Sequence, residues 1–151
     1  MPATCQLARL MLSGAPEEPM MIKRRPMVLI AEDDDELREL LVWAIRRDGA
    51  DVVELEDGDE LLDFLDFVAR FQNPRGLPDL ILTDVQMPGC SGLDMIALAR
   101  ARGVSCPFVV LTGYADDRVQ RTAEAIGNTT VLSKPQDLDF IRDVVRERMH
   151  P

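Results

Sequence analysis

Five short apolar runs, separated by longer amphipathic segments, constrain the fold of this chain more than any other feature. The runs lie at residues 28–31, 52–55, 80–82, 108–111 and 130–132. Several of them are continuously apolar and stop at an acid or a glycine, which is typical of strands buried on both faces. Between the runs, apolar residues recur at helical spacing around residues 37–45, 61–68, 93–100, 116–126 and 138–145. This alternation predicts an α/β fold with a five-stranded parallel sheet covered by five helices.

The first helical segment also carries signals for its own ends. Asp35 is a candidate N-cap and Gly49 a candidate stop. Taken alone, Asp34 and Asp35 are more readily explained as solvated acids at a helix N-terminus than as ligands. We expect Trp43, on the same segment, to be partly buried.

Length and composition suit one globular domain. The chain has 151 residues, of which 46% are apolar, and this is enough for a core without disulfides or a structural metal. Residues 1–26 are read as an extension, because they combine a turn-like stretch at 15–19 with a basic cluster at 23–25. We expect this extension to be poorly ordered and residues 27–151 to form the domain.

Charge and residue counts exclude several classes of function. A formal net charge of −10 argues against nucleic acid as a partner, and no apolar run approaches the length of a membrane span. Cys5, Cys90 and Cys106 have neither metal-ligand nor redox spacing, so a reducing cytoplasm fits best. His150 is the only histidine, which excludes most histidine-based catalysis and a histidine phosphodonor within this chain.

Chemically capable side chains collect where the predicted strands end. Parallel sheets bind ligands at the carboxyl ends of their strands, so these side chains should converge on one edge. Crowded carboxylates resist ionising unless a cation is present, and a few oxygen ligands suit Mg²⁺. A carboxylate held beside a cation is also a nucleophile suited to phosphorus. The side chains concerned are those of Glu32, Asp33, Asp34 and Asp35 after the first strand, Asp84 after the third, Thr112 after the fourth and Lys134 after the fifth.

Each of these residues has an ordinary explanation when it is taken alone. Acids after a strand are often helix caps, Thr112 alone suits a turn, and Lys134 alone suits the surface. Their conjunction at the ends of different strands is what favours a site.

Four segments of the chain together resemble the response-regulator receiver family. VLIAEDDDELRELL resembles the family's first strand and acidic pair, and PDLILTDVQMPGCSGLDMI its phosphoacceptor strand and loop. VVLTGYAD resembles the strand that bears a hydroxyl, and VLSKP the lysine–proline motif. The similarity runs from about Met27 to Met149, in the family's order and spacing.

The resemblance implies a flavodoxin-like three-layer sandwich with strand order 2-1-3-4-5. It implies that Asp84 is the phosphoacceptor. It also implies that Asp33, Asp84 and the backbone carbonyl of Gln86 bind Mg²⁺ directly, with Glu32 acting through a water and Mn²⁺ as an alternative ion.

The same resemblance assigns roles to the later motifs. Thr112 would follow the phosphoryl group on activation, and Lys134 would pair with the phosphoryl group or, before transfer, with Asp84. The peptide bond between Lys134 and Pro135 would be cis, which proline permits.

Two departures from the family pattern concern the switch. The family usually has an aromatic residue where this chain has Val131, so an aromatic rotation there is unavailable and loop or helix rearrangement would replace it. Gln86 and Tyr114 occupy positions that tune attack by water on the phosphoryl group in this family, and Tyr114 would screen the site or take part of the missing aromatic role.

Taken together, the resemblance implies a cytoplasmic two-component response regulator. It would receive its phosphoryl group from a histidine kinase or a histidine phosphotransfer protein, and catalyse only its own phosphorylation and dephosphorylation. No sequence follows the last predicted helix, so output would be contact with an unknown downstream protein or transfer within a phosphorelay, unless the chain is part of a longer one. A monomer or a weak homodimer is expected.

Three other classes of protein compete with this interpretation. A haloacid-dehalogenase-type phosphatase needs a second aspartate where Gln86 stands. A flavodoxin-like FMN carrier needs a phosphate-cradling first loop, but residues 32–35 are all acidic. A receiver-like interaction module that is independent of phosphorylation stays open because of Val131, although the acid pair, Asp84, Thr112 and Lys134 argue against it.

Overall fold

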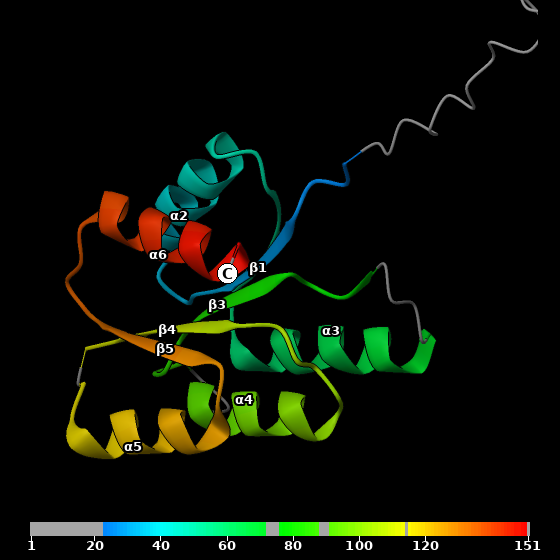
Figure 1. Cartoon of the computed structure of the whole chain (residues 1–151), viewed down its shortest axis with the longest axis vertical. Helices are drawn as coiled ribbons and strands as arrows, with labels where there is room; N and C mark the ends of the chain where they lie inside the picture. The colour runs from blue at the N-terminus through cyan, green and yellow to red at the C-terminus, as the bar shows by residue number, and fades with distance from the viewer. Residues whose placement is uncertain (1–22, 72–75, 88–90, 114, 151) are drawn as a thin grey trace, which may run out of the picture.

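The computed structural model describes residues 23–71, 76–87, 91–113 and 115–150, within which strands and helices alternate (Figure 1). The strands are β1 (Met27–Ala31), β2 (Asp51–Leu55), β3 (Leu80–Asp84), β4 (Phe108–Thr112) and β5 (Thr129–Ser133). The helices are α2 (Asp35–Arg47), α3 (Gly58–Phe71), α4 (Gly92–Ala101), α5 (Asp117–Ile126) and α6 (Leu138–Met149). The alternating pattern read from the sequence is confirmed.

The five strands form one parallel sheet in the order β2-β1-β3-β4-β5, as the resemblance implied. The chain runs outward in one direction from β1 to β2, then crosses back to β3 and continues to β5. The reversal therefore falls between β1 and β3. Ligands bind open α/β sheets outside the carboxyl ends of the strands at such a reversal, so the fold singles out the residues that follow β1 and β3.

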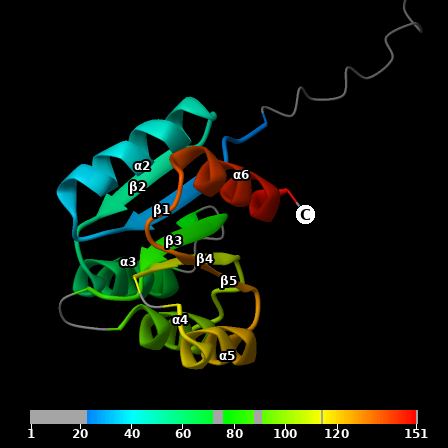
Figure 2. The same cartoon turned by 90° about the vertical axis from the view of Figure 1, so that its left-hand side faces the viewer.

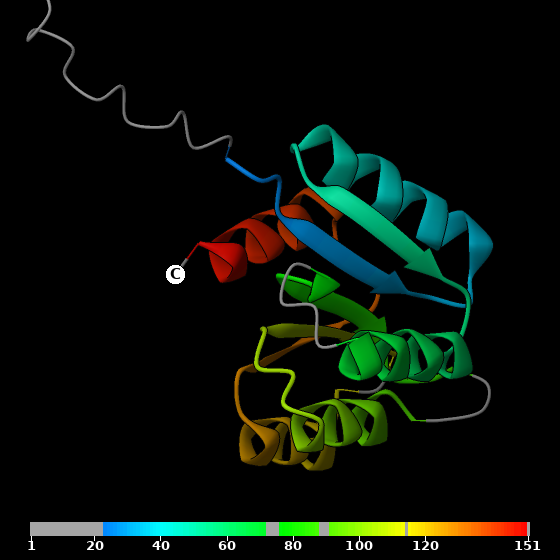
Figure 3. The same cartoon turned by 90° about the vertical axis from the view of Figure 1, so that its right-hand side faces the viewer.

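The helices cover the sheet in two layers (Figures 1 and 2). α2 and α6 pack on one face, and α3, α4 and α5 pack on the other, which Figure 3 shows from the opposite side. Alternate residues of a strand point to opposite faces, so Ile30 joins the core under α2 and α6 whereas Leu29 joins the core over α3, α4 and α5. β3 and β4 are buried at every position, which explains their continuously apolar sequences.

Helix α2 begins one residue earlier than expected, at the residue that was predicted to be its cap. The cap is Asp34, whose carboxylate accepts a hydrogen bond from the backbone N–H of Leu37 at 3.0 Å. The prediction that Asp35 is the N-cap is therefore wrong, because Asp35 is already helical and its side chain pairs with Arg38. The predicted stop is confirmed: Gly49 follows the helix with φ +94°, a conformation that favours glycine.

The buried stripe of α2 is narrower than its apolar sequence suggests. Leu41, Ala44 and Ile45 are buried, but Leu40 is 53% exposed and Trp43 is 57% exposed. The prediction that Trp43 is partly buried packing is thus corrected, because its position on the helix faces away from the sheet.

None of the described helices is both long enough and apolar enough to cross a membrane. Residues 1–22, which make up most of the expected extension, lie outside the described residues.

Candidate functional site

Side chains from the ends of three strands, β1, β3 and β5, meet at the reversal of strand order. Glu32 and Asp33 follow β1, and Asp84 is the last residue of β3. One carboxylate oxygen from each of these three lies within 4.8 Å of the other two. Glu32 and Asp84 are buried, whereas Asp33 is exposed. The parallel sheet therefore brings together three acids that are separated by up to about fifty positions in sequence.

Lys134 supplies the cation of this cluster. Its Nζ lies 2.6 Å from Asp84 Oδ2 and 3.2 Å from Glu32 Oε2, so one ammonium donates to both buried carboxylates. The backbone N–H of Lys134 donates to the carbonyl oxygen of Thr112 at 2.7 Å, which ties the residue to the end of β4. The Lys134–Pro135 peptide bond is cis.

The acids are not electrostatically satisfied by this lysine alone. The pKa of Glu32 is raised to about 7, mainly by burial and also by the nearby charge of Asp84, against the lowering effects of the hydrogen bond from the Asp34 N–H and of Lys134. Burial by itself lowers the pKa of Lys134, but the hydrogen bond to Asp84 and the charge of Glu32 outweigh it and leave the pKa above its ordinary value. The cluster consequently carries more negative charge than its protein groups neutralise.

The loop after β3 is built closely around Asp84. The backbone N–H of Gln86 donates to Asp84 Oδ1 at 2.9 Å, so both carboxylate oxygens have partners. The N–H of Gly92 donates to the carbonyl of Val85 at 2.9 Å. A Cβ at Gly92 would clash with the backbone carbonyl of Asp84, so the return of the chain to α4 requires glycine at this position.

Thr112 ends β4 on the other side of Asp84. Thr112 is buried, and its backbone carbonyl oxygen accepts a hydrogen bond from the backbone N–H of Lys134. A groove of about 480 Å³ opens beside it, with Gln86, Asp94 and Arg118 among the residues of its wall. The groove therefore adjoins both Thr112 and the two residues that follow Asp84, Val85 and Gln86.

The donor set fits a hard divalent cation. Three carboxylates supply oxygen ligands without sulfur or imidazole, as Mg²⁺ and Mn²⁺ prefer. The uncompensated charge on two buried acids also favours binding of a cation.

A second cation, which the sequence analysis did not single out, lies beside this cluster. Arg38 of α2 is buried, and its Nη1 donates to the backbone carbonyl of Glu32 at 2.8 Å. Its Nη2 lies 2.6 Å from Asp35 Oδ1, and its guanidinium also faces Glu54 at 3.7 Å and Glu56 at 3.8 Å.

Arg38 explains how the acidic run after β1 is divided. Asp34 caps α2, Asp35 pairs with Arg38, and Glu32 and Asp33 remain for the cluster. The signal in the sequence was an arginine three positions after an acid within a predicted helix, a spacing that places both on one side.

Of the remaining residues singled out from the sequence, the structure describes Val131 and Cys106 but not Tyr114, Cys90 or Cys5. Val131 lies in β5, partly buried and paired in register with Val110. Tyr114 and Cys90 lie outside the described residues, as does Cys5. Cys106 precedes β4, and burial raises the pKa of its thiol to about 11, which suits its predicted role as a small packing residue.

Comparison with known proteins agrees with the motifs. The family model described as response regulator receiver domain matches residues 28–146. A cyclic di-GMP phosphodiesterase of Thermotoga maritima is 30% identical over 115 residues, which are 76% of this chain but only 28% of that protein. Sporulation initiation phosphotransferase F of Bacillus subtilis is 29% identical over 80% of this chain and 90% of its own length.

Solved structures show the same fold. The receiver domain of the Francisella response regulator 1452 superposes with a TM-score of 0.70 at 23% identity, covering 83% of this chain and 97% of that one. The strand order and the arrangement of layers described above are thus those of a known architecture.

Proposed function

Because this chain belongs to the response regulator receiver domain family, we propose that it is a phosphorylation switch in which Asp84 accepts the phosphoryl group. The observation that supports this choice most directly is the position of Asp84. Its carboxylate lies at the centre of the cluster, with Lys134 on one oxygen and the N–H of Gln86 on the other. Glu32 also has a donor on each carboxylate oxygen, the N–H of Asp34 and the ammonium of Lys134, both at 3.2 Å, but the two contacts to Asp84 are shorter, at 2.9 Å and 2.6 Å.

The transfer is a displacement at phosphorus. A carboxylate oxygen of Asp84 attacks the phosphorus of a phosphorylated histidine on a kinase or phosphotransfer protein, the new P–O bond forms as the P–N bond breaks, and the imidazole leaves with the electron pair. Lys134 donates to Asp84 before transfer and is placed to donate to phosphoryl oxygens afterwards.

Three acids would hold the divalent cation that such chemistry uses. These are Asp33 and Asp84 directly, with the backbone carbonyl of Gln86, and Glu32 through a water. When bound, Mg²⁺ supplies positive charge against the oxygens of the phosphoryl group.

Thr112 would report the new phosphoryl group to the rest of the fold. It ends β4 next to the cluster, and its carbonyl is bonded to the backbone of Lys134. Movement of Thr112 toward the phosphoryl oxygens would therefore act on both β4 and the β5–α6 loop. With Val131 in place of an aromatic residue, we propose that these loops and α5 carry the change, and that Gln86 and Tyr114 set the rate of hydrolysis.

The domain in this proposal comprises residues 27–151, preceded by a separate segment at 1–26. The switch would work in the cytoplasm, would catalyse no reaction other than its own phosphorylation and dephosphorylation, and would signal by contact with a downstream protein. The relative named a phosphotransferase, which this chain spans almost fully, supports a role in passing a phosphoryl group on.

Incubation with acetyl phosphate tests the proposal. We expect intact mass to show one phosphoryl adduct that forms only with Mg²⁺ or Mn²⁺ and is absent from Asp84→Asn. Asp66→Asn, an exposed acid on α3 that pairs with Arg102, is the matched control and should be labelled like the parent chain.

Two results would contradict the proposal. A metal-dependent adduct that persists in Asp84→Asn would place the acceptor elsewhere. If no adduct forms with acetyl phosphate or with phosphorylated histidine phosphotransfer proteins, and calorimetry also shows no Mg²⁺ binding, the chain is an interaction module that does not use phosphorylation.

A further inference from the structure

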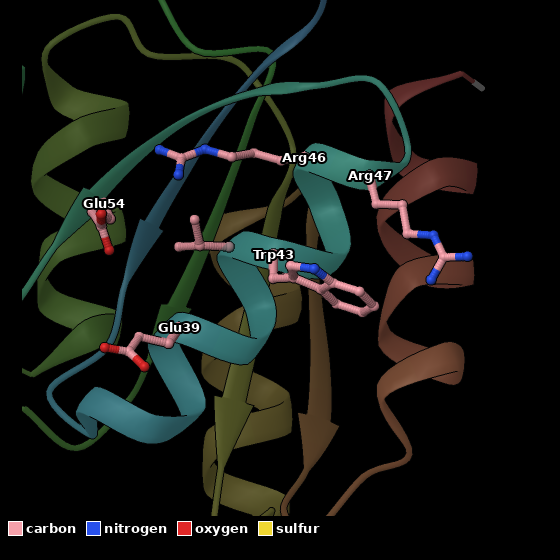
Figure 4. A pocket seen from close by; sticks show the side chains of 6 residues that line it. Glu39, Trp43, Arg46, Arg47 and Glu54 are labelled. Atoms are coloured by element: carbon pink, nitrogen blue, oxygen red, sulfur yellow. The ribbon is translucent and has the colours of Figure 1, made fainter.

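The outer face of α2 leaves a large aromatic side chain uncovered. Trp43, the only tryptophan of the chain, is 57% exposed, and Leu40 beside it is 53% exposed. A groove of about 470 Å³ lies between Trp43 and Glu54 of the edge strand β2 (Figure 4), and the buried Val42 also lines it. Tryptophan is strongly enriched at protein interfaces, where its ring supplies a large contact area.

Charged residues flank Trp43 in an ordered way. Glu39 precedes Trp43 by four positions and Arg46 follows it by three. Because each residue turns the helix by about 100°, both side chains are rotated away from Trp43 in the same direction around the helix axis, Glu39 by about 40° and Arg46 by about 60°. Figure 4 shows this arrangement, with Glu39 and Arg46 on the same side of Trp43 at opposite ends of the groove. Along the helix axis they lie about 6 Å and about 4.5 Å from Trp43 in opposite directions.

Such a face is complementary to itself. If a second copy is related to the first by a twofold axis that lies between the two α2 helices, perpendicular to both and level with Trp43, the acidic end of one groove faces the basic end of the other. We propose that two copies of this chain associate through this face, with their α2 helices antiparallel and Trp43 at the centre. Glu39 of each copy then meets Arg46 of the other, so the axis generates two equivalent ion pairs.

The charges in question are available for this contact. In the described part of the chain, neither Glu39 nor Arg46 forms an ion pair, and Arg46 makes only a long hydrogen bond of 3.4 Å to the carbonyl of Val52. The guanidinium of Arg47 lies 5.2 Å from the centre of the Trp43 ring, which holds the ring against the helix.

The net charge of −10 does not oppose a contact at this place. At physiological ionic strength, charges more than about 8 Å apart are largely screened, whereas directly opposed charges still attract. The local pattern of charges therefore governs the docking of two copies more than the total does.

Trp43 provides its own reporter of the association. Small interfaces dissociate at micromolar to millimolar concentrations. We therefore expect the sedimentation coefficient to rise from that of a monomer to that of a dimer as the protein concentration increases from about 5 µM to about 1 mM. The emission of Trp43 should shift to the blue over the same concentrations, as the ring leaves water. Trp43→Ala should weaken association at least about tenfold, as loss of a central aromatic residue does. Phe67→Ala is the control, because Phe67 is 61% exposed on α3, away from this face.

A charge exchange tests the antiparallel register. Glu39→Arg and Arg46→Glu should each weaken association about three- to tenfold, since each places like charges together twice. The double variant restores opposite charges and should return to within about threefold of the parent chain. Circular dichroism of each variant checks that the fold is retained.

Three results would overturn the proposal. One is a parent chain that stays monomeric over the whole concentration range. Another is an unchanged association in Trp43→Ala, which would place the interface on a different face. The third is a double variant as weak as the single ones, which would refute the pairing of Glu39 with Arg46.

Discussion

Two cations at the carboxyl ends of the strands, Lys134 and Arg38, each face several acids, but with opposite patterns of burial. The side chain of Lys134 is 27% exposed and faces two buried carboxylates, those of Glu32 and Asp84. The side chain of Arg38 is only 9% exposed, while Asp35 is 79% exposed. A partly exposed cation thus serves buried acids in one cluster, and a buried cation is surrounded by exposed acids in the other.

This difference separates a reactive cluster from a supporting one. The acids around Arg38 are exposed and keep much of their hydration, so their charge does not need a bound cation. The two buried acids that face Lys134 have lost water, and this burial is the main reason why the pKa of Glu32 is raised. We therefore expect a bound cation or a change of charge to alter the Lys134 cluster and to leave the Arg38 cluster unchanged.

Removing the ammonium should have the largest effect. In Lys134→Met, we expect the rate of phosphoryl incorporation from acetyl phosphate to fall about 100-fold or more, because a charge that stabilises the transferring group is lost. Quench-flow with intact-mass detection measures this rate. Arg102→Met, at the C-cap of α4, is the control and should keep the parent rate. Retention of more than a third of the rate in Lys134→Met would remove Lys134 from the transfer step.

Removing the guanidinium should instead cost stability that Mg²⁺ does not restore. Arg38→Met leaves the buried carbonyl of Glu32 without its donor, and we expect the free energy of unfolding to fall by about 1–3 kcal/mol. Urea denaturation with and without Mg²⁺ measures the loss. Arg70→Met, an exposed arginine on α3, should change stability by less than about 0.5 kcal/mol. A loss that disappears when Mg²⁺ is added would show that the two clusters are not independent.

Glu32 should make stability depend on pH in the opposite way to an ordinary ion-paired acid. Its pKa in the fold, about 7, is above its ordinary value of 4.5, so its contribution is fully present below pH 4.5 and is lost as pH rises through 7. We expect Glu32→Gln to be more stable than the parent chain at pH 8 without Mg²⁺, by about 1 kcal/mol, and equal to it near pH 5. A difference that is constant with pH would contradict this account.

Asp48 offers the ordinary case, at the other end of α2. A hydrogen bond from Arg142 of α6 lowers its pKa below the usual value, with Arg146 contributing as well. Its stabilising effect is therefore present above pH 4 or so and lost as pH falls through the lowered pKa. We expect Asp48→Asn to lower the melting temperature by about 1–3 °C at pH 7, with no difference near pH 2. Scanning calorimetry across this range distinguishes the two behaviours.

The alternation of strands and helices, and the residues that end each strand, could be predicted from the amino-acid sequence alone. Both are local properties: the runs at 80–82 and 108–111 are apolar because both faces of their strands are covered, and the breaks after them are read directly from the chain. The motifs around Asp84 and Lys134 were sufficient to identify the family, because their order and spacing are maintained by the strand order itself.

The pairing of the charged side chains, in contrast, could not be predicted without the packing of the folded chain. The acids at 32–35 are equivalent in sequence, yet Asp34 caps a helix, Asp35 turns to Arg38, and Glu32 is buried beside Asp84. The exposure of Trp43 was likewise misjudged from the sequence, since its burial depends on which side of α2 meets the sheet. Burial and pairing are set by packing between segments distant in the chain, whereas periodicity specifies only that each segment has an apolar side.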